Sequence, residues 1–223
     1  MIVVHHLENS RSQRVLWLLE ELAVPYEVKR YLRDKETMLA PKELKAVHPL
    51  GKSPVITDGA RTLAESGAIL EYLVGTYGNG RLVPKEGTEE RLRYTYFTHY
   101  AEGSVMPPLL LKLIFDRVET APMPFFVRPI AKQIAKKVKS QFVMPQIETH
   151  FSFLERELGK REWFAGDEMT AADIQMSFPL EAAGSRGALD DSRPKLREFV
   201  KRIHARPAYQ RALEAGGPYD YAS

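Results

Sequence analysis

The chain has 223 residues, 44% of them hydrophobic and 27% charged, with a formal net charge of +3 and no cysteine. This length allows one large domain or two small ones, with enough chain to bury a core. The absence of cysteine excludes a disulfide scaffold, thiolate-bound metal sites and a protein cysteine nucleophile. No apolar run approaches the roughly 18–20 residues of a membrane span, and the N-terminus lacks the layout of a cleavable signal. We therefore expect a cytoplasmic protein without a membrane span.

The first 80 or so residues alternate short β-rich runs with helical patterns. Residues 2–6 and 26–31 are predicted strands. An apolar stripe between them predicts a helix with Ser10 or Ser12 as its N-cap. A hairpin is predicted further along, with its turn at Asp58-Gly59.

Ser66 begins another predicted helix directly after this hairpin. The element order is then β-α-β-α-β-β-α. This order predicts an α/β domain with a mixed sheet over residues 1–80.

From about Thr88 the patterns become mainly helical, which predicts an all-α domain over residues 88–223. Thr170 and Asp173 have the spacing of an N-cap and an acidic N3 residue. The prolines at which we expect the helical patterns to break are Pro107, Pro108, Pro122, Pro124, Pro129, Pro145 and Pro207.

The positive charge belongs to one stretch of this second part. Residues 111–142 hold seven basic and two acidic side chains, whereas the rest of the chain holds 25 basic and 27 acidic ones. Within it, residues 128–142 carry apolar residues at helical spacing among lysines, namely Ile130, Ile134 and Val138. An amphipathic helix with a solvated basic face is expected, and contact with an anionic ligand or membrane surface is the alternative.

Nucleic-acid and metal binding are not expected. No recognition motif accompanies the basic stretch, and the six histidines show no metal-ligand spacing.

Two motifs of the first domain have both a structural and a functional interpretation. Pro54 interrupts a predicted strand, which favours an edge strand or a loop; alternatively, a cis bond there presents the backbone of Val55 to a peptide. Glu65-Ser66 lies where a strand ends and a helix begins, which favours simple capping. A hydroxyl and free N–H groups at that helix N-terminus would also suit a carboxylate, and Glu65 would suit an ammonium group.

Two further polar segments are ambiguous in the same way. Residues 9–14 open the first helix and provide either an N-cap with solvated arginines or a hydroxyl aimed at an anion. Lys52 is either an ordinary loop lysine or a carboxylate partner. Each signal is weak alone, and their order within one small α/β domain carries the weight.

These segments together resemble the glutathione S-transferase superfamily, which joins a thioredoxin-like N-terminal domain to an all-helical one. The resemblance covers nearly the whole chain and is closest to the fungal Gtt-type branch and its bacterial relatives. The matching segments are residues 10–20, 48–55, 63–67, 100–104, 107–108, 170–174 and 177–180.

The resemblance implies that glutathione is a co-substrate and that no cofactor is tightly bound. Val55, after a cis-Pro54, would pair its backbone with the cysteinyl part of glutathione. Glu65 and Ser66 would hold the γ-glutamyl end, and Lys52 the glycine carboxylate.

The residue that activates the thiol has three candidates. Counted back from Arg14, Ser10 matches the serine of theta-type enzymes. Counted from the cysteine-using bacterial classes, the position falls near Asn9, and Ser12 is a third candidate. Tyrosine is excluded because none precedes Tyr26.

A hydroxyl is strong enough for this task. Lowering a thiol pKa from about 8.5 by about two units takes roughly 2.7 kcal/mol. A hydrogen bond to a charged group contributes about 1.5–3 kcal/mol and a helix N-terminus about 0.3–1 kcal/mol more.

A hydrophobic second substrate is expected between the domains, with Tyr100, Ser104 and Phe115 as candidates whose alternative role is helical core. The resemblance also implies a symmetric homodimer, in which a polar residue near Glu102 would reach the neighbour's glutathione. The expected activity is conjugation of the glutathione thiolate to hydrophobic electrophiles. The alternatives are a glutathione-dependent peroxidase or disulfide reductase, and a non-catalytic glutathione-fold binding or stress protein.

Overall fold

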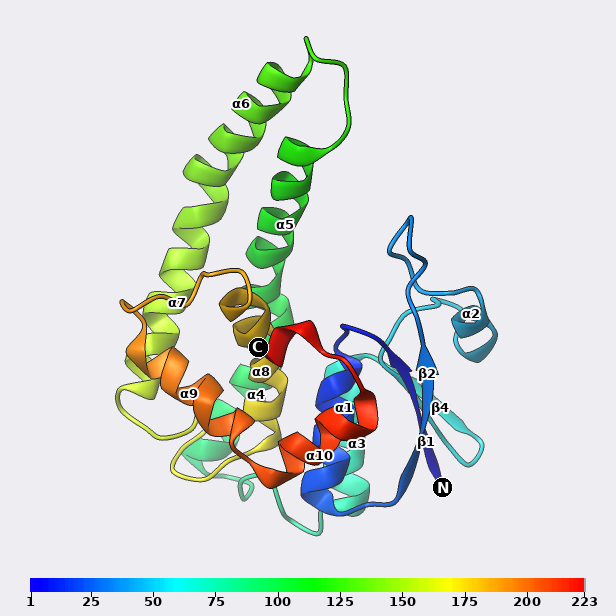
Figure 1. The fold of residues 1–223 in the computed structure, drawn as a ribbon. Coiled ribbons are helices and arrows are strands. Elements are labelled where there is room, and N and C mark those ends of the chain that lie inside the picture. Colours follow the sequence, from blue (N-terminus) through cyan, green and yellow to red (C-terminus); the bar gives the residue numbers. More distant parts are fainter. Residues whose placement is uncertain (223) are drawn as a thin grey trace.

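A four-stranded mixed sheet is built from the N-terminal third of the chain in the computed structural model, which describes residues 1–222 (Figure 1). The strands are β1 (Ile2–Leu7), β2 (Tyr26–Tyr31), β3 (Val55–Asp58) and β4 (Arg61–Ala64). Their order across the sheet is β2-β1-β3-β4, with β1 parallel to β2 and antiparallel to β3. The predicted hairpin is confirmed as the antiparallel pair β3–β4.

Helices lie on both faces of this sheet. They are α1 (Ser12–Leu22), α2 (Glu43–Val47) and α3 (Ser66–Tyr77). Helices α1 and α3 separate the sheet from the helical region (Figure 1). On the other face, Leu44 of α2 packs against Leu7 and Tyr31. The predicted order β-α-β-α-β-β-α and the mixed sheet are therefore confirmed.

The second region is helical to the end of the described chain. Its elements are α4 (Glu89–Tyr100), the π-helical turn η1 (Ala101–Val105), α5 (Met106–Thr120), α6 (Arg128–Val138), the π-helical turn η2 (Lys139–Val143), α7 (Met144–Leu158), α8 (Ala171–Gly184), α9 (Pro194–His204), α10 (Pro207–Gly216) and the 3-10 turn η3 (Asp220–Ala222). Helix α8 is the centre, because almost all of its residues are buried against the surrounding helices. Its capping box between Thr170 and Asp173 forms as expected. The domain boundary at residues 80–88 stays a prediction.

The expected helix breaks at Pro107, Pro108 and Pro145 are wrong. The chain runs without interruption from α4 through η1 into α5, and from α6 through η2 into α7. Each π-helical turn widens the backbone directly before the proline, so the missing N–H does not force the helix to end. The other expected prolines do mark ends, since Pro122 and Pro124 lie between α5 and α6, and Pro129 and Pro207 lie in first helical turns.

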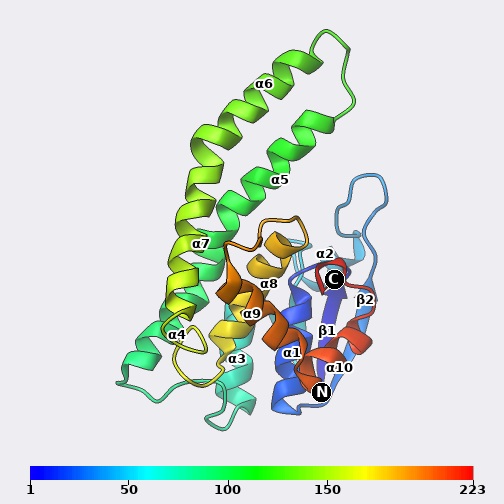
Figure 2. The ribbon, with the colours of Figure 1, turned by 60° about the vertical axis from the view of Figure 1, so that its left-hand side comes forward.

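Helices α5 and α6 form a hairpin that extends beyond the rest of the molecule (Figures 1 and 2). The helix predicted in the basic stretch is present, but Ile130 and Ile134 are exposed and the small side chain of Ala135 is buried instead. Val138, at the end of α6, packs against the core as an amphipathic pattern usually indicates, whereas the apolar side nearer the start of α6 stays exposed at Ile130 and Ile134. Within residues 1–222, no helix is long and apolar enough to cross a membrane.

Candidate functional site

Three serine hydroxyls and one imidazole meet at the start of α1. Ser10 Oγ lies 2.8 Å from Ser12 Oγ and 3.3 Å from Ser53 Oγ. Ser12 Oγ lies 2.9 Å from His6 Nδ1. Ser10, Ser12 and His6 are buried and Ser53 is half-buried, so the four groups form one continuous hydrogen-bonded chain that leads from the protein interior toward its surface.

The imidazole at the inner end of this chain is neutral. Burial, assisted by the positive charge of Arg30, lowers the pKa of His6 to about 4. A neutral imidazole has one N–H, on either Nδ1 or Nε2. With the proton on Nδ1, His6 donates to Ser12, Ser12 donates to Ser10, and the Ser10 proton is available to another acceptor. Such a chain polarises each hydroxyl and makes the last one a stronger donor.

The segment that precedes β3 brings a second part of the chain to this place. The Ser53–Pro54 peptide bond is cis. Val55 follows it at the start of β3, is fully buried, and pairs with His5 on one side and Ala64 on the other. Because Val55 has strand partners on both sides, the backbone of Ser53, which precedes the cis bond and lies outside the paired strand, is a candidate that sequence reasoning missed.

Glu65 and Ser66 follow directly after Ala64 and therefore lie next to Val55. Glu65 has a φ of 73°, in the left-handed region that is costly for a residue with a side chain. Ser66 is buried at the first turn of α3. Backbone strain of this kind occurs preferentially at functional sites. Of the predicted binding residues, the sheet thus brings Pro54, Val55, Glu65 and Ser66 together at one end.

Two predicted binding residues carry exposed charges. Among the residues that the structure describes, the side chains of Lys52 and Glu65 make neither a hydrogen bond nor an ion pair. The ammonium group of Lys52 and the carboxylate of Glu65 are therefore accessible to a ligand from solvent.

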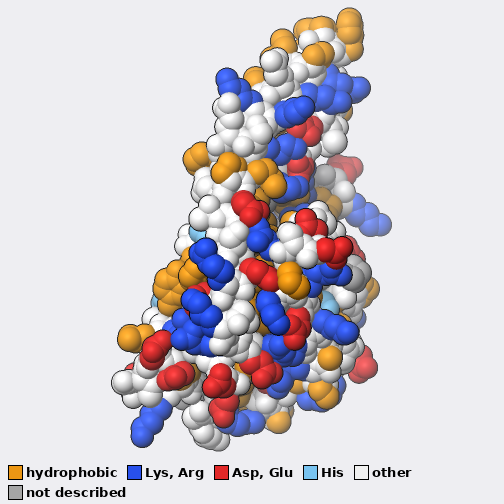
Figure 3. Space-filling view, turned by 90° about the vertical axis from the view of Figure 1, so that its left-hand side faces the viewer, with side chains coloured by type: hydrophobic (Ala, Val, Ile, Leu, Met, Phe, Trp, Pro, Cys, Tyr) orange, Lys and Arg blue, Asp and Glu red, His pale blue; other side chains and the backbone are white. Residues whose placement is uncertain are grey.

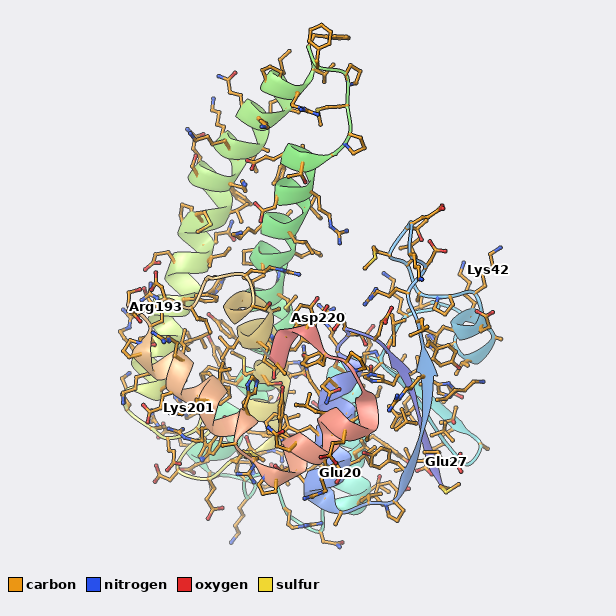
Figure 4. All side chains as sticks on the ribbon, viewed as in Figure 1. Glu20, Glu27, Lys42, Arg193, Lys201 and Asp220 are labelled. Carbon is orange, nitrogen blue, oxygen red and sulfur yellow. The ribbon has the colours of Figure 1, made fainter. Side chains whose placement is uncertain are left out.

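The side chain of Asn9, the first rival of Ser10, is engaged by the C-terminal turn. Its amide nitrogen donates to Asp220 Oδ2 at 2.8 Å, and its amide oxygen accepts from the Asp220 N–H at 2.9 Å. Asp220 lies beside the loop between β1 and α1 (Figure 4). The amide of Asn9 therefore ties two distant parts of the chain together.

A charged cluster joins α1 to the helical region. Glu102 of η1 accepts hydrogen bonds from Arg11 Nε at 2.9 Å and from Arg14 Nη2 at 2.6 Å. Arg14 is buried and also donates to Gln175 of α8 at 2.6 Å. Burial alone would raise the pKa of Glu102, but Arg14 and Arg11 hold it below its usual value. Glu102 is thus paired within its own chain. The expected contact of a polar residue near Glu102 with a neighbour's glutathione stays a prediction.

The candidates for the second-substrate site lie along the continuous helical run from α4 through η1 into α5. Tyr100 Oη lies 2.5 Å from His150 Nδ1 of α7, and its ring stacks on Tyr96, so its contacts are those of the helical core. Ser104 is half-buried in η1, and Phe115 is half-buried in α5. No recorded contact within residues 1–222 joins any of the three to Ser10.

An apolar cluster beside the charged one was missed by sequence reasoning. Phe178, Ala182 and Tyr219 are buried together, with Met106 packed against them. The guanidinium groups of Arg11 and Arg14 each lie 5.0 Å from the centre of the Phe178 ring. Phe178 belongs to the apolar run of α8, but no local signal connects that helix to Tyr219 near the C-terminus.

A cavity of about 620 Å³ lies elsewhere, between the linker residues 80–84 and the loop at residues 165–170. None of the predicted site residues lines it, so it does not bear on the site around Ser10.

Comparison with known proteins agrees with this two-part architecture. Models of the N-terminal and C-terminal domains of glutathione S-transferases match residues 10–75 and 116–207. Glutathione S-transferase 3 of Schizosaccharomyces pombe is 37% identical over 96% of this chain and 87% of its own length. Glutathione S-transferase 1 of Saccharomyces cerevisiae is 34% identical over 96% and 94%. The crystal structure of a glutathione S-transferase from Actinobacillus pleuropneumoniae aligns with a TM-score of 0.83 and 32% identity over 100% of this chain and 96% of that one.

Proposed function

Because the chain belongs to the glutathione S-transferase family and is a glutathione transferase, we propose that Ser10 stabilises the thiolate of bound glutathione. The observation that carries this proposal is the 3.3 Å contact between Ser10 Oγ and Ser53 Oγ. It sets the hydroxyl of Ser10 beside the cis-proline segment, whose backbone is the expected partner of the cysteinyl residue. A thiol held there lies within reach of the Ser10 proton and of the positive end of α1.

The surroundings of Asn9 and Ser12, the two other candidates for thiol activation, support the choice of Ser10. The amide of Asn9 is occupied by Asp220, and Ser12 is fully buried between Ser10 and His6. Ser12 therefore acts on the sulfur through Ser10, and His6 orients Ser12.

The remaining glutathione contacts follow from the same end of the sheet. Glu65 takes the γ-glutamyl ammonium group, and Ser66 with the N-terminus of α3 takes the γ-glutamyl carboxylate. Lys52 takes the glycine carboxylate, because its ammonium group is exposed and unpaired in the part of the chain described. The backbones of Val55 and Ser53 border the cysteinyl residue.

The reaction is a nucleophilic substitution or addition on the second substrate. The thiol loses its proton to solvent. The thiolate sulfur then donates an electron pair to the electrophilic carbon and forms the new S–C bond. In a substitution, the leaving group departs with the electron pair of the broken bond; in an addition, the π bond of the electrophile breaks and the resulting carbanion takes a proton from solvent. The sulfur's negative charge is then lost, so the Ser10 hydrogen bond stabilises the nucleophile before attack rather than the product.

The second substrate is a hydrophobic electrophile in this proposal. Its predicted contacts remain Tyr100, Ser104 and Phe115. A further candidate for lining its binding site is the apolar cluster formed by Met106, Phe178 and Tyr219. This cluster is favoured because Phe178 packs under Arg11, which directly follows Ser10 in the chain.

The proposal includes a cytoplasmic homodimer. The support for a dimer is an exposed apolar stripe along α4 and α5, formed by Leu92, Tyr96, Leu110 and Ile114. Large apolar side chains exposed together on neighbouring helices are typical of surfaces that pair with another chain.

A substrate panel tests the function. The purified protein is assayed with glutathione and a chloronitroarene, an organic hydroperoxide or a small disulfide. Conjugation of the chloronitroarene is expected, with a large loss in Ser10→Ala and retained glutathione binding. Turnover of the hydroperoxide or disulfide alone would favour the peroxidase or reductase alternative. Glutathione binding without any turnover would favour a binding protein.

A further inference from the structure

The free end of the α5–α6 hairpin exposes two large aromatic side chains. Phe125 is 85% and Phe126 is 66% exposed. They lie in the loop between the two helices, at the end of the hairpin that projects away from both the sheet and the helical core (Figures 1 and 2). Exposed aromatic residues at such a projection have no role in the fold that surrounds them.

The apolar surface continues from the loop along α6. Val127, Ile130 and Ile134 are 37%, 60% and 56% exposed, and their spacing places them on one side of the helix. We call the two phenylalanines and these three residues the hairpin tip. The buried side chain on this helix is Ala135, so the large apolar residues of the hairpin tip are the ones left exposed to solvent.

Positive charge surrounds this apolar surface. The sequence has no acidic residue between Glu119 and Glu148, but it has five basic ones there. Lys139 is neutralised by Asp116 and Glu119 at the base of the hairpin. The other four form no ion pair within residues 1–222, and they are Arg128, Lys132, Lys136 and Lys137. Figure 3 shows hydrophobic side chains gathered at the end of the projection and basic ones directly below them.

We propose that the hairpin tip docks on the surface of anionic phospholipid bilayers. Phenylalanine and isoleucine side chains enter the boundary between headgroups and acyl chains, while flanking lysines and arginines contact lipid phosphates. Each basic side chain near an anionic bilayer adds to the attraction, and aromatic insertion adds an apolar contribution that salt does not screen.

Charge distinguishes this occupant from a second copy of the chain. Two hairpin tips placed together would bring two sets of four unpaired cations close to each other, and like charges repel. An anionic bilayer supplies the opposite charge along with the apolar phase. The docking would hold the enzyme where hydrophobic electrophiles accumulate, but it does not depend on the identity of the thiol-activating residue.

The experiment measures co-sedimentation of the full chain with vesicles of phosphatidylcholine alone or of phosphatidylcholine mixed with phosphatidylglycerol. Two variants alter the hairpin tip and its charge: Phe125→Ser with Phe126→Ser, and Lys132→Gln with Lys136→Gln and Lys137→Gln. Matched controls alter exposed residues elsewhere: Leu32→Ser, which is 70% exposed in the wild type, and Lys35→Gln with Lys42→Gln and Lys85→Gln.

Wild type and controls are expected to bind the mixed vesicles, and both hairpin variants at least about tenfold more weakly. Added salt should weaken binding of the phenylalanine variant more completely than that of wild type, because only the charge component remains in it. Conjugation of a water-soluble electrophile should be unchanged in both variants. Failure of the wild type to bind mixed vesicles, or equal binding by the hairpin variants, would overturn the proposal. A smaller molecular mass of the hairpin variants by light scattering would instead assign the tip to a second copy of the chain.

Discussion

Ser12 Oγ lies 2.8 Å from Ser10 Oγ and has no exposed surface. The direction of the proton between these two oxygens decides what Ser10 can do. When Ser12 donates to Ser10, the Ser10 proton is available to a glutathione sulfur. When Ser12 donates to His6 instead, Ser10 can donate to Ser12 and loses its proton for the ligand.

Removal of the Ser12 hydroxyl should therefore weaken thiol activation without removing Ser10. In Ser12→Ala, we expect the pKa of bound glutathione to rise by about half a unit to one unit, because a hydrogen bond contributes about 1 kcal/mol. The measurement is the ultraviolet absorbance of the bound thiolate as a function of pH. Ser12→Thr keeps a hydroxyl and should restore the lower pKa. An equal thiol pKa in wild type and Ser12→Ala would show that Ser12 has only a packing role.

His6 should make the folded protein sensitive to acid. Its pKa is about 4 in the folded state and about 6.5 in the unfolded chain, so between these values the unfolded state binds more protons. The free energy of unfolding should therefore fall by about 3 kcal/mol from this group as the pH drops from 6.5 to 4.

Urea unfolding at several pH values tests this prediction. His6→Gln should lose that part of the pH dependence, whereas the exposed His99→Gln should keep it. An identical pH dependence in wild type and His6→Gln would contradict the burial of a neutral imidazole at this position.

Loss of Glu102 should destabilise the protein because it leaves the buried guanidinium of Arg14 without its negative partner. We expect Glu102→Ala to reduce the free energy of unfolding by about 3 kcal/mol, the low end for a buried pair because Glu102 is partly exposed. Adding Arg14→Met should recover part of this loss, since the unpaired charge is then absent. Glu198→Ala, which breaks an exposed pair with Lys195, is the control and should have a much smaller effect. Equal losses in Glu102→Ala and Glu198→Ala would contradict the assignment.

Lys52 should distinguish glutathione from its glycyl ethyl ester. The wild type should bind glutathione about tenfold more tightly than the ester, because the ester lacks the carboxylate that pairs with Lys52. In Lys52→Met, this preference should disappear, with the affinity for the ester almost unchanged. Isothermal titration gives both dissociation constants, and Lys42→Met is the matched surface control. A preference that persists in Lys52→Met would move the carboxylate contact to another cation.

Local signals made much of the N-terminal fold predictable. The turn at Asp58-Gly59 needs a residue that adopts positive φ, and Gly59 has a φ of 58°. The capping box of α8 depends only on Thr170 and Asp173, three residues apart. Both features depend on residues close together in the chain, so the sequence alone is enough to predict them.

The contacts that assemble the site are not local. Ser10 meets Ser53 across 43 positions of the chain, and Asn9 meets Asp220 across 211. Neither contact has a sequence pattern, because each depends on how whole elements pack. Resemblance to a family indicated the region of the site, but the pairing of Glu102 with Arg11 and Arg14 required the structure.

The exposure of Ile130 and Ile134 shows a second limit of prediction from sequence. An amphipathic pattern indicates which side of a helix is apolar, but it does not say whether the protein covers that side. Here the small side chain of Ala135 and, in part, that of Val138 are covered, while the larger side chains of Ile130 and Ile134 stay exposed.

The most direct test of the account is the pKa of the glutathione thiol bound to wild type and to Ser10→Ala, measured by thiolate absorbance at saturating glutathione. We expect a value about one to two units higher in Ser10→Ala, with glutathione still bound, because the variant lacks the hydrogen bond to the anion. An unchanged thiol pKa in Ser10→Ala would contradict the account and move the activating role to Asn9 or Ser12.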